Sequence, residues 1–239
     1  MAPARPTCCS AVTVGDVKRL AEEAYGAIPA VELAERLRPE VSAIEATQRF
    51  TGTAAKAMLT RKYVVPSRIT GNAGEAEALE NIKQVLNGSG RLVKPPLGDA
   101  RPEITARAFY SDARIGDGEF VLVSRERDPE NTEAELDRVI TAVRTDGVTE
   151  AEPASAKARI VADHAADNYD GKSIAARYDV VAIGVPIDRI AARLAALAKV
   201  TSQDVHDVAV KYLDPRRAVT GWLLPEAPAA GEQSSLSTA

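Results

Sequence analysis

The segment from residue 147 to residue 226 constrains the fold most, because it predicts several helices in succession and then a single strand. Threonine and an acidic residue stand at capping-box spacing where two of these helices would begin, namely Thr149 with Glu152 and Thr201 with Asp204. Such side chains satisfy the free N–H groups of a first helical turn. The predicted helices cover residues 150–167, 171–183, 187–198 and 202–213. The apolar run at 217–224 then predicts a closing strand.

The middle of the chain predicts the rest of a sheet. The expected strands cover residues 59–65, 103–110 and 119–124, and the expected helices cover residues 74–86 and 132–146. Two strands that follow each other directly indicate an antiparallel component rather than a strict alternation of strands and helices. We therefore expect an α+β fold in which several helices pack on a mixed or antiparallel sheet.

The N-terminal part predicts one short helix. It begins near Val14 with Asp16 as its cap, and Gly26 ends it. Its apolar face consists of Val17, Leu20, Ala21 and Ala24. Residues 29–58 have only a moderate helical tendency around 30–37, so we expect a linker there, and the small polar tail at 227–239 is expected to be disordered.

Composition excludes several classes of partner. The net charge is −4 and the charged residues of both signs are interleaved, so no basic surface for nucleic acid is expected. No apolar run reaches 18 residues, so no membrane span is expected. Aromatic residues are only 4% of the chain, so the core must depend on small aliphatic side chains.

The two cysteines, Cys8 and Cys9, are adjacent and predict neither a disulfide framework nor a zinc knuckle. The surrounding N-terminus lacks the apolar core of a secretory signal. As written, the chain is therefore expected in the cytoplasm, and an upstream segment that carries a signal would make it periplasmic.

The two histidines are the first candidates for chemistry. His164 and His206 are 42 positions apart, so they cannot act as a pair on one helix. Asp163 and Asp167 flank His164, but one imidazole with two carboxylates on a helix would make a weak metal site. We expect both histidines to be surface or helix-end residues, with His206 on the polar side of its helix.

Other motifs also fail to indicate catalysis. The sequence contains no GxSxG, no P-loop and no GxGxxG motif. Arg216 and Arg217 are expected to be solvated at a helix end rather than to bind phosphate. For Arg177 and Tyr178 we expect a packed tyrosine beside an exposed arginine rather than a site.

Several stretches resemble the pitrilysin/insulinase-type zinc peptidases, the M16 family that includes mitochondrial processing peptidase. The clearest are GVTEAEPASAKARIVADHAAD and VTSQDVHDVAVKYLDPRRAVTGWLLPE in the last 80 residues, with VGDVKRLAEEAYGAIPA, LTRKYVVPS and EAEALENIKQVLNGSG before them. The resemblance implies two similar α+β domains, of which the first carries zinc and the second closes over the substrate. It divides this chain into an N-terminal stub of a first domain (1–28), a linker (29–58), an M16-like C-terminal domain (59–226) and a tail (227–239).

The zinc motif of that family, HxxEH, is absent from the sequence. It would supply two imidazoles four residues apart and a glutamate that activates the metal-bound water. We therefore expect no catalytic, metal-binding or cofactor-binding residue in this chain, and we expect zinc only in a partner domain.

The resemblance also implies an arginine and a tyrosine in the second domain that steady the substrate carbonyl. Arg125 and Arg127 lie in the corresponding region, but no tyrosine follows before Tyr169, and apolar residues and Glu119 occupy the strand itself. The pair is therefore expected to be absent.

These expectations combine into a non-catalytic C-terminal domain of an M16-type metalloendopeptidase, inactive alone, which helps a zinc-bearing HxxEH partner form the peptide-binding chamber. The alternative is a truncated or inactive family remnant without activity of its own. The sequence does not identify the peptide, the partner or the oligomeric state. If a first domain is missing, the stub at residues 14–28 should leave an exposed apolar patch.

Overall fold

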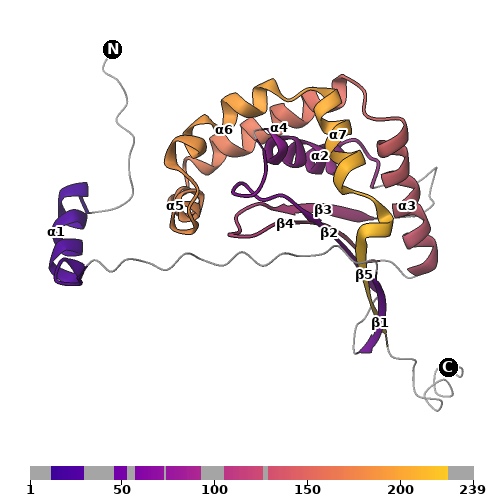
Figure 1. Cartoon of the computed structure of the whole chain (residues 1–239), viewed down its shortest axis with the longest axis horizontal. Helices are drawn as coiled ribbons and strands as arrows, with labels where there is room; N and C mark the ends of the chain where they lie inside the picture. Colours follow the sequence, from indigo (N-terminus) through magenta and orange to yellow (C-terminus); the bar gives the residue numbers. More distant parts are fainter. Residues whose placement is uncertain are drawn as a thin grey trace, which may run out of the picture.

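The computed structural model describes residues 12–29, 46–52, 57–72, 74–92, 105–125 and 129–225. Within these ranges the chain forms two layers, a twisted sheet and a group of helices that covers one face of it (Figure 1). The strands are β1 (Ala46–Gly52), β2 (Met58–Val65), β3 (Ala106–Ser111), β4 (Gly118–Ser124) and β5 (Ala218–Pro225). The helices are α1 (Val14–Tyr25), α2 (Glu75–Gly88), α3 (Pro129–Thr145), α4 (Ala151–Asp167), α5 (Gly171–Asp179), α6 (Ile187–Lys199) and α7 (Ser202–Tyr212), with 3₁₀ turns η1 (Val180–Ile183) and η2 (Pro215–Arg217).

The sheet has the strand order β1-β5-β2-β4-β3. Three of its pairings, β5 with β2, β2 with β4 and β4 with β3, are antiparallel, whereas β1 runs parallel to β5. The predicted α+β fold with a mixed sheet is thus confirmed. The closing strand β5 lies next to β2, the first strand of the antiparallel part, so the two ends of this region meet in the middle of the sheet.

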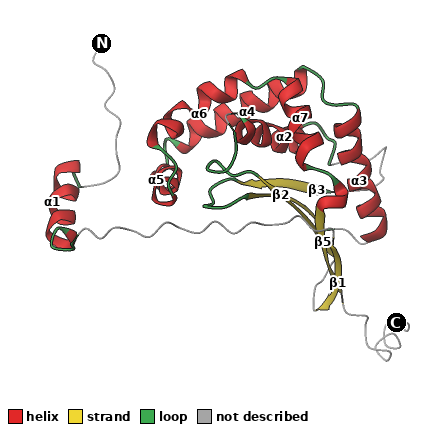
Figure 2. Cartoon of the chain, viewed as in Figure 1, coloured by secondary structure: helices red, strands yellow, loops and turns green. Residues whose placement is uncertain are grey.

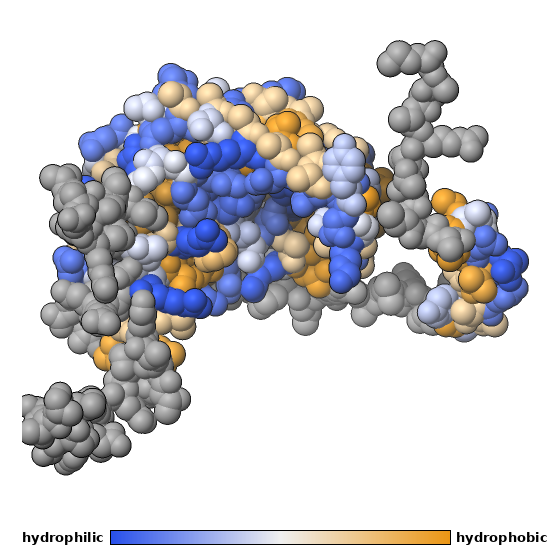
Figure 3. Space-filling model, turned by 180° about the vertical axis from the view of Figure 1, so that it is seen from behind, coloured by the Kyte–Doolittle hydropathy of each residue, from blue (hydrophilic) through white to orange (hydrophobic). Residues whose placement is uncertain are grey.

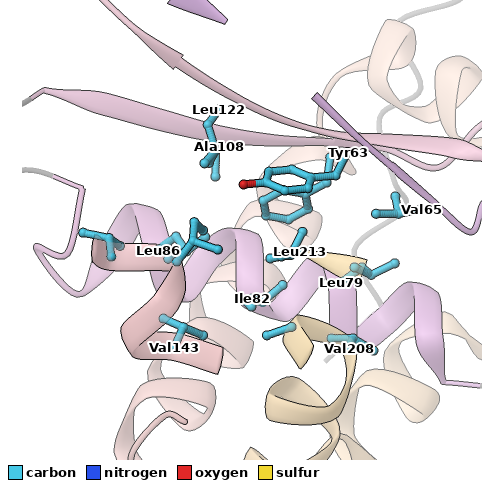
Figure 4. Close-up of a cluster of buried hydrophobic side chains, with 14 of the residues drawn as sticks. Tyr63, Val65, Leu79, Ile82, Leu86, Ala108, Leu122, Val143, Val208 and Leu213 are labelled. Carbon is cyan, nitrogen blue, oxygen red and sulfur yellow. The ribbon is translucent and has the colours of Figure 1, made fainter. Parts of the chain in front are cut away.

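The core lies between the sheet and α2. Successive residues of a strand point to opposite faces, and the burial of β2 and β4 alternates accordingly. Side chains from four strands share this core with α2, and Figure 4 shows the Tyr63 ring above the helix that carries Leu79, Ile82 and Leu86. Each of these α2 side chains is fully buried, which contributes about 1.5–3 kcal/mol per residue relative to exposure. Because α2 is buried on a broad face, it positions the helices α4, α6 and α7 that pack around it (Figure 2).

The capping predictions are confirmed in one case and corrected in two. Thr201 and Asp204 form a complete capping box at the start of α7. At α4 only half of the box forms: the Glu152 carboxylate accepts the Thr149 N–H, and no side chain caps the first turn. At α1 the cap is Thr13, whose hydroxyl accepts the N–H of Asp16 while the Asp16 carboxylate accepts from the Thr13 N–H.

Several observed elements differ from the prediction, and α3 begins at Pro129 rather than at 132. The α-helix expected over residues 171–183 ends at Asp179, and the chain continues as the 3₁₀ turn η1. Gly184, which adopts φ 100°, ends that turn. Strand β3 covers Ala106–Ser111, and residues 103 and 104 of the predicted strand lie outside the described ranges. Strand β1 lies inside the segment expected to be a linker, and its parallel pairing with β5 was not predicted. Residues 30–45 of that segment, the tail at 227–239 and both cysteines lie outside the described ranges.

Helix α1 stands apart from the two layers (Figure 1). None of its residues is buried. Its apolar side chains are among the most exposed in the described chain, and Figure 3 shows hydrophobic patches on its surface. The predicted apolar patch on residues 14–28 is therefore present.

Candidate functional site

The face of the sheet opposite the helices is the main candidate surface, and we call it the open face. No described helix covers it (Figure 2). Strand alternation directs one set of side chains toward it from the four antiparallel strands. The set includes Thr60, Lys62 and Val64 of β2, Arg107 and Phe109 of β3, Glu119, Val121 and Val123 of β4, and Val219 of β5, and Gly221 of β5 adds only backbone.

The centre of the open face is a row of aligned residues across four strands. Phe109 pairs with Val121, Val121 with Lys62, and Lys62 with Val219. Phe109 is 47% exposed and Val219 is 44% exposed, so apolar surface is available at both ends of the row. A surface of this kind can hold an apolar partner while the lysine provides one fixed charge.

The charges on this face are partly paired. The Lys62 ammonium lies 3.4 Å from the Glu119 carboxylate, and the Arg114 guanidinium lies 3.1 Å from the same carboxylate. Both cations are about half exposed, so these pairs contribute little to stability. Their consequence is a mixed surface in which polar groups surround apolar ones.

A buried ionic cluster on the opposite side of the sheet holds this face in place. Arg61 of β2 donates to the Thr220 hydroxyl of β5 at 3.0 Å and to Glu133 of α3 at 2.8 Å, and it also pairs with Asp137 of α3. The indole N–H of Trp222 donates to the second oxygen of Glu133 at 3.1 Å. The cluster therefore ties two neighbouring strands to one helix.

Burial alone would lower the pKa of Arg61, but the neighbouring acidic groups of Tyr63, Asp137 and Glu133 outweigh it and raise that pKa. Burial also raises the pKa of Tyr63 to about 12, so this phenol is neutral at physiological pH. Its hydroxyl has no hydrogen-bond partner among the described residues. This cluster was not predicted from the sequence. Its signal was an arginine at a core-facing position of an apolar strand, between Leu59 and Tyr63.

The second concave feature lies among the helices, and we call it the helix groove. It has a volume of about 650 Å³ and is lined by α2, α6 and α7. Its apolar lining consists of Ala78, Ala192, Ala195, Ala196, Val200 and Val208.

A polar network includes two residues that line the helix groove, Glu75 and Lys211. The Lys211 ammonium lies 2.6 Å from the Glu75 carboxylate, and the Tyr212 hydroxyl donates to the same carboxylate at 2.8 Å. Partial burial alone would raise the pKa of Glu75, but the donated hydrogen bonds from Lys211, the Asn72 N–H and Tyr212 lower it. The groove thus combines an apolar lining with charged groups of both signs.

The histidine predictions are partly confirmed. His164 lies in the last turn of α4, where partial burial and the nearby guanidinium groups of Arg177 and Arg193 lower its pKa. In the described ranges, no three histidine, cysteine, aspartate or glutamate side chains, those of Asp163 and Asp167 included, gather closely enough to hold a metal ion. His206 is half-buried rather than solvated, and its Nε2 lies 2.9 Å from the Arg144 carbonyl oxygen at the end of α3. It therefore serves packing between α3 and α7.

The prediction for Arg216 agrees with the structure, whereas the prediction for Arg177 and Tyr178 does not. The exposed Arg216 folds back on Asp214 with contacts of 2.8 and 3.2 Å, in keeping with a solvated helix end. The prediction for Arg177 and Tyr178 is wrong. Arg177 is partly buried and donates to the Asn168 side chain at 2.7 Å, whereas Tyr178 is exposed.

The residues expected near the missing arginine–tyrosine pair do not come together. Arg125 is exposed directly after β4, Glu119 lies at the other end of the same strand, and Tyr169 is exposed after α4. Arg127 lies outside the described residues.

Neither a family model nor a curated protein matches the sequence. Solved structures do match it. One is a peptidase M16 inactive domain from Pseudomonas fluorescens, with 15% identity and a TM-score of 0.70 over 90% of this chain and 52% of that one. Another is the inactive peptidase domain of a predicted zinc protease from Bordetella parapertussis, with 11% identity and a TM-score of 0.59 over 77% of this chain and 98% of that one. The fold is that of an M16 inactive domain.

The M16-type fold extends to larger proteins. The periplasmic protease PqqL from Escherichia coli matches with 17% identity and a TM-score of 0.58 over 90% of this chain and 24% of PqqL. This chain thus spans about half the length of the Pseudomonas structure and about a quarter of PqqL. Among the described helices, none has both the length and the apolar character that a membrane crossing requires.

Proposed function

We propose that this chain is a non-catalytic M16-type domain that completes the peptide-binding chamber of a zinc-bearing HxxEH domain or subunit. The observation that carries the proposal is the combination of an M16 inactive-domain fold with an uncovered sheet face of exposed apolar residues. The absence of HxxEH from the whole sequence assigns the zinc chemistry to the partner. This chain would supply a wall and no reacting group.

The open face has the composition that a chamber wall requires. Its central row from Phe109 to Val219 can contact apolar side chains of an extended peptide. Lys62 and Glu119 offer polar contacts of both signs beside it. The Arg61 cluster below keeps β2 and β5 in register, which makes the wall rigid.

The compartment remains part of the proposal. We propose the cytoplasm or the periplasm, since one protein with this fold, PqqL, is a periplasmic protease. Fractionation of the native organism distinguishes the two, since the partner must share the compartment.

The test is a binding titration of the purified chain with a zinc-bearing M16-type domain from the same genome, in the presence of an unstructured peptide. Val219→Glu places a charge in the open face and should weaken association at least about tenfold, equivalent to about 1.4 kcal/mol. Val161→Glu on α4 is the matched control, since Val161 is 48% exposed on the helix side, and it should bind as the native chain does.

Equal binding by both variants would contradict the role of the open face. No association of the native chain with any zinc-bearing M16-type domain of that genome would favour the inactive remnant instead.

A further inference from the structure

We propose that two copies of this chain associate by exchanging α1, with the apolar face of each α1 seated in the helix groove of the other copy. The proposal does not depend on the zinc-bearing partner. It names α1 of the other copy as the occupant of the helix groove, which has no part in the proposed function.

The first argument concerns α1 itself. Its apolar residues recur as Val17, Leu20, Ala21 and Ala24, which is the i, i+3, i+4, i+7 spacing by which a helix anchors in an apolar groove. Val17 and Leu20 are each about half exposed, and none of the helix is buried. Because an isolated helix of 12 residues is marginal in water, the amphipathic α1 requires an apolar surface to persist.

The second argument concerns the helix groove. Three alanines of α6 and one of α2 line it, and such small side chains allow the axis of an incoming helix to approach to about 8 Å. The groove lies between α2, α6 and α7, and its lining includes the buried core residues Ala78, Val200 and Val208 beside the more exposed alanines of α6. Its opening is bordered by charges of both signs, among them Lys199 and Asp207, and α1 likewise carries Lys18 and Glu22 beside its apolar face.

The third argument is the buried area. A helix of 12 residues is about 18 Å long and about 10–12 Å wide with its side chains, so seating half of its lateral surface in a groove buries roughly 300 Å² on each partner. One such contact therefore totals about 600 Å², which is below the range of about 1,200–2,000 Å² for stable specific interfaces. Two reciprocal contacts reach about 1,200 Å², the lower end of that range, and close the assembly with two-fold symmetry. The area thus favours a reciprocal dimer over a single contact.

The experiment uses the full chain at about 100 µM, well above a micromolar Kd, with mass measured by light scattering after size exclusion. The native chain should elute as a dimer, at twice the monomer mass of 25.3 kDa. Leu20→Glu in α1 and Ala195→Arg in the helix groove should each yield monomers. Both residues are solvent-exposed in the single chain, so circular dichroism should show unchanged folding. Val219→Glu is the control, because it alters the open face and should leave the dimer intact.

Mixing the two monomeric variants provides the sharpest result. The Ala195→Arg chain retains a functional α1 and the Leu20→Glu chain retains a functional groove, so the mixture should form a heterodimer that neither variant forms alone. A native chain that stays monomeric, variants that stay dimeric, or a mixture that stays monomeric would each overturn the proposal. Loss of the dimer by Val219→Glu would likewise overturn it, because self-association would then use the open face.

Discussion

For the buried Arg61 cluster we predict that neutralising its two carboxylates destabilises the protein more than removing the arginine does. The charge that each change leaves buried, and not the number of lost contacts, sets the difference in stability. Arg61 is 3% exposed and lies between two carboxylates of α3. The double change Glu133→Gln with Asp137→Asn keeps the side-chain shapes but leaves the guanidinium buried without a counter-charge. Breaking a buried ion pair in this way costs about 3–5 kcal/mol.

The opposite change gives a different result. Arg61→Met removes the buried charge and leaves two carboxylates whose side chains are 22% and 45% exposed, so water can reach them. The expected loss is about 1–2 kcal/mol, mainly from the lost hydrogen bonds. Combining all three changes should restore part of the stability that the carboxylate double variant loses.

Urea denaturation followed by fluorescence of Trp222 measures these differences, because this chain has a single tryptophan and its side chain is buried beside the cluster. For a chain of this size, a loss of about 4 kcal/mol lowers Tm by roughly 8–16 °C. If the double carboxylate variant were as stable as Arg61→Met, or more stable, the argument from an uncompensated buried charge would be refuted.

Two further predictions concern single groups. Tyr63→Phe removes a buried hydroxyl that has no described partner, so it should change the free energy of unfolding by less than about 1 kcal/mol, and a loss above about 2 kcal/mol in urea denaturation would contradict this. Hydrogen bonding to Arg216 lowers the pKa of Asp214 from 3.8 to about 2, so its stabilising contribution is present above pH 3.8 and is lost as the pH falls toward 2. The Tm difference between the native chain and Asp214→Asn should therefore narrow over that interval, and a constant difference would count against the assignment.

Most of the helices were predicted because the two features that indicate a helix, its N-terminal cap and its apolar face, lie within one short window of the sequence. The α7 segment shows this clearly, since the Thr201 cap and the apolar face around Val205 and Val208 are both readable within one window and both occur in the structure. The same holds for α2, whose apolar face lies in the core. Element boundaries differed from the predicted ones by a few residues, as at the start of α3 at Pro129 and the end of α5 at Asp179.

The features that were not predicted depend on contacts between residues that are far apart in the sequence. Strand β1 is stabilised by parallel pairing with β5, more than 160 residues later, and no local alternation marks it. Arg61 finds its carboxylates on α3 more than 70 residues away, so its strand position indicated burial without indicating the partners. Tyr178 was expected to pack, but α5 contributes no buried residue, because its contacts with the main layers are few.

The most direct test of the account is the zinc content and peptide cleavage of the purified chain, measured alone and again with a zinc-bearing M16-type partner. The account predicts substoichiometric zinc and no cleavage by the chain alone, and cleavage by the mixture that exceeds that of the partner alone and is weakened by Val219→Glu. Stoichiometric zinc together with peptide cleavage by the chain alone would contradict it.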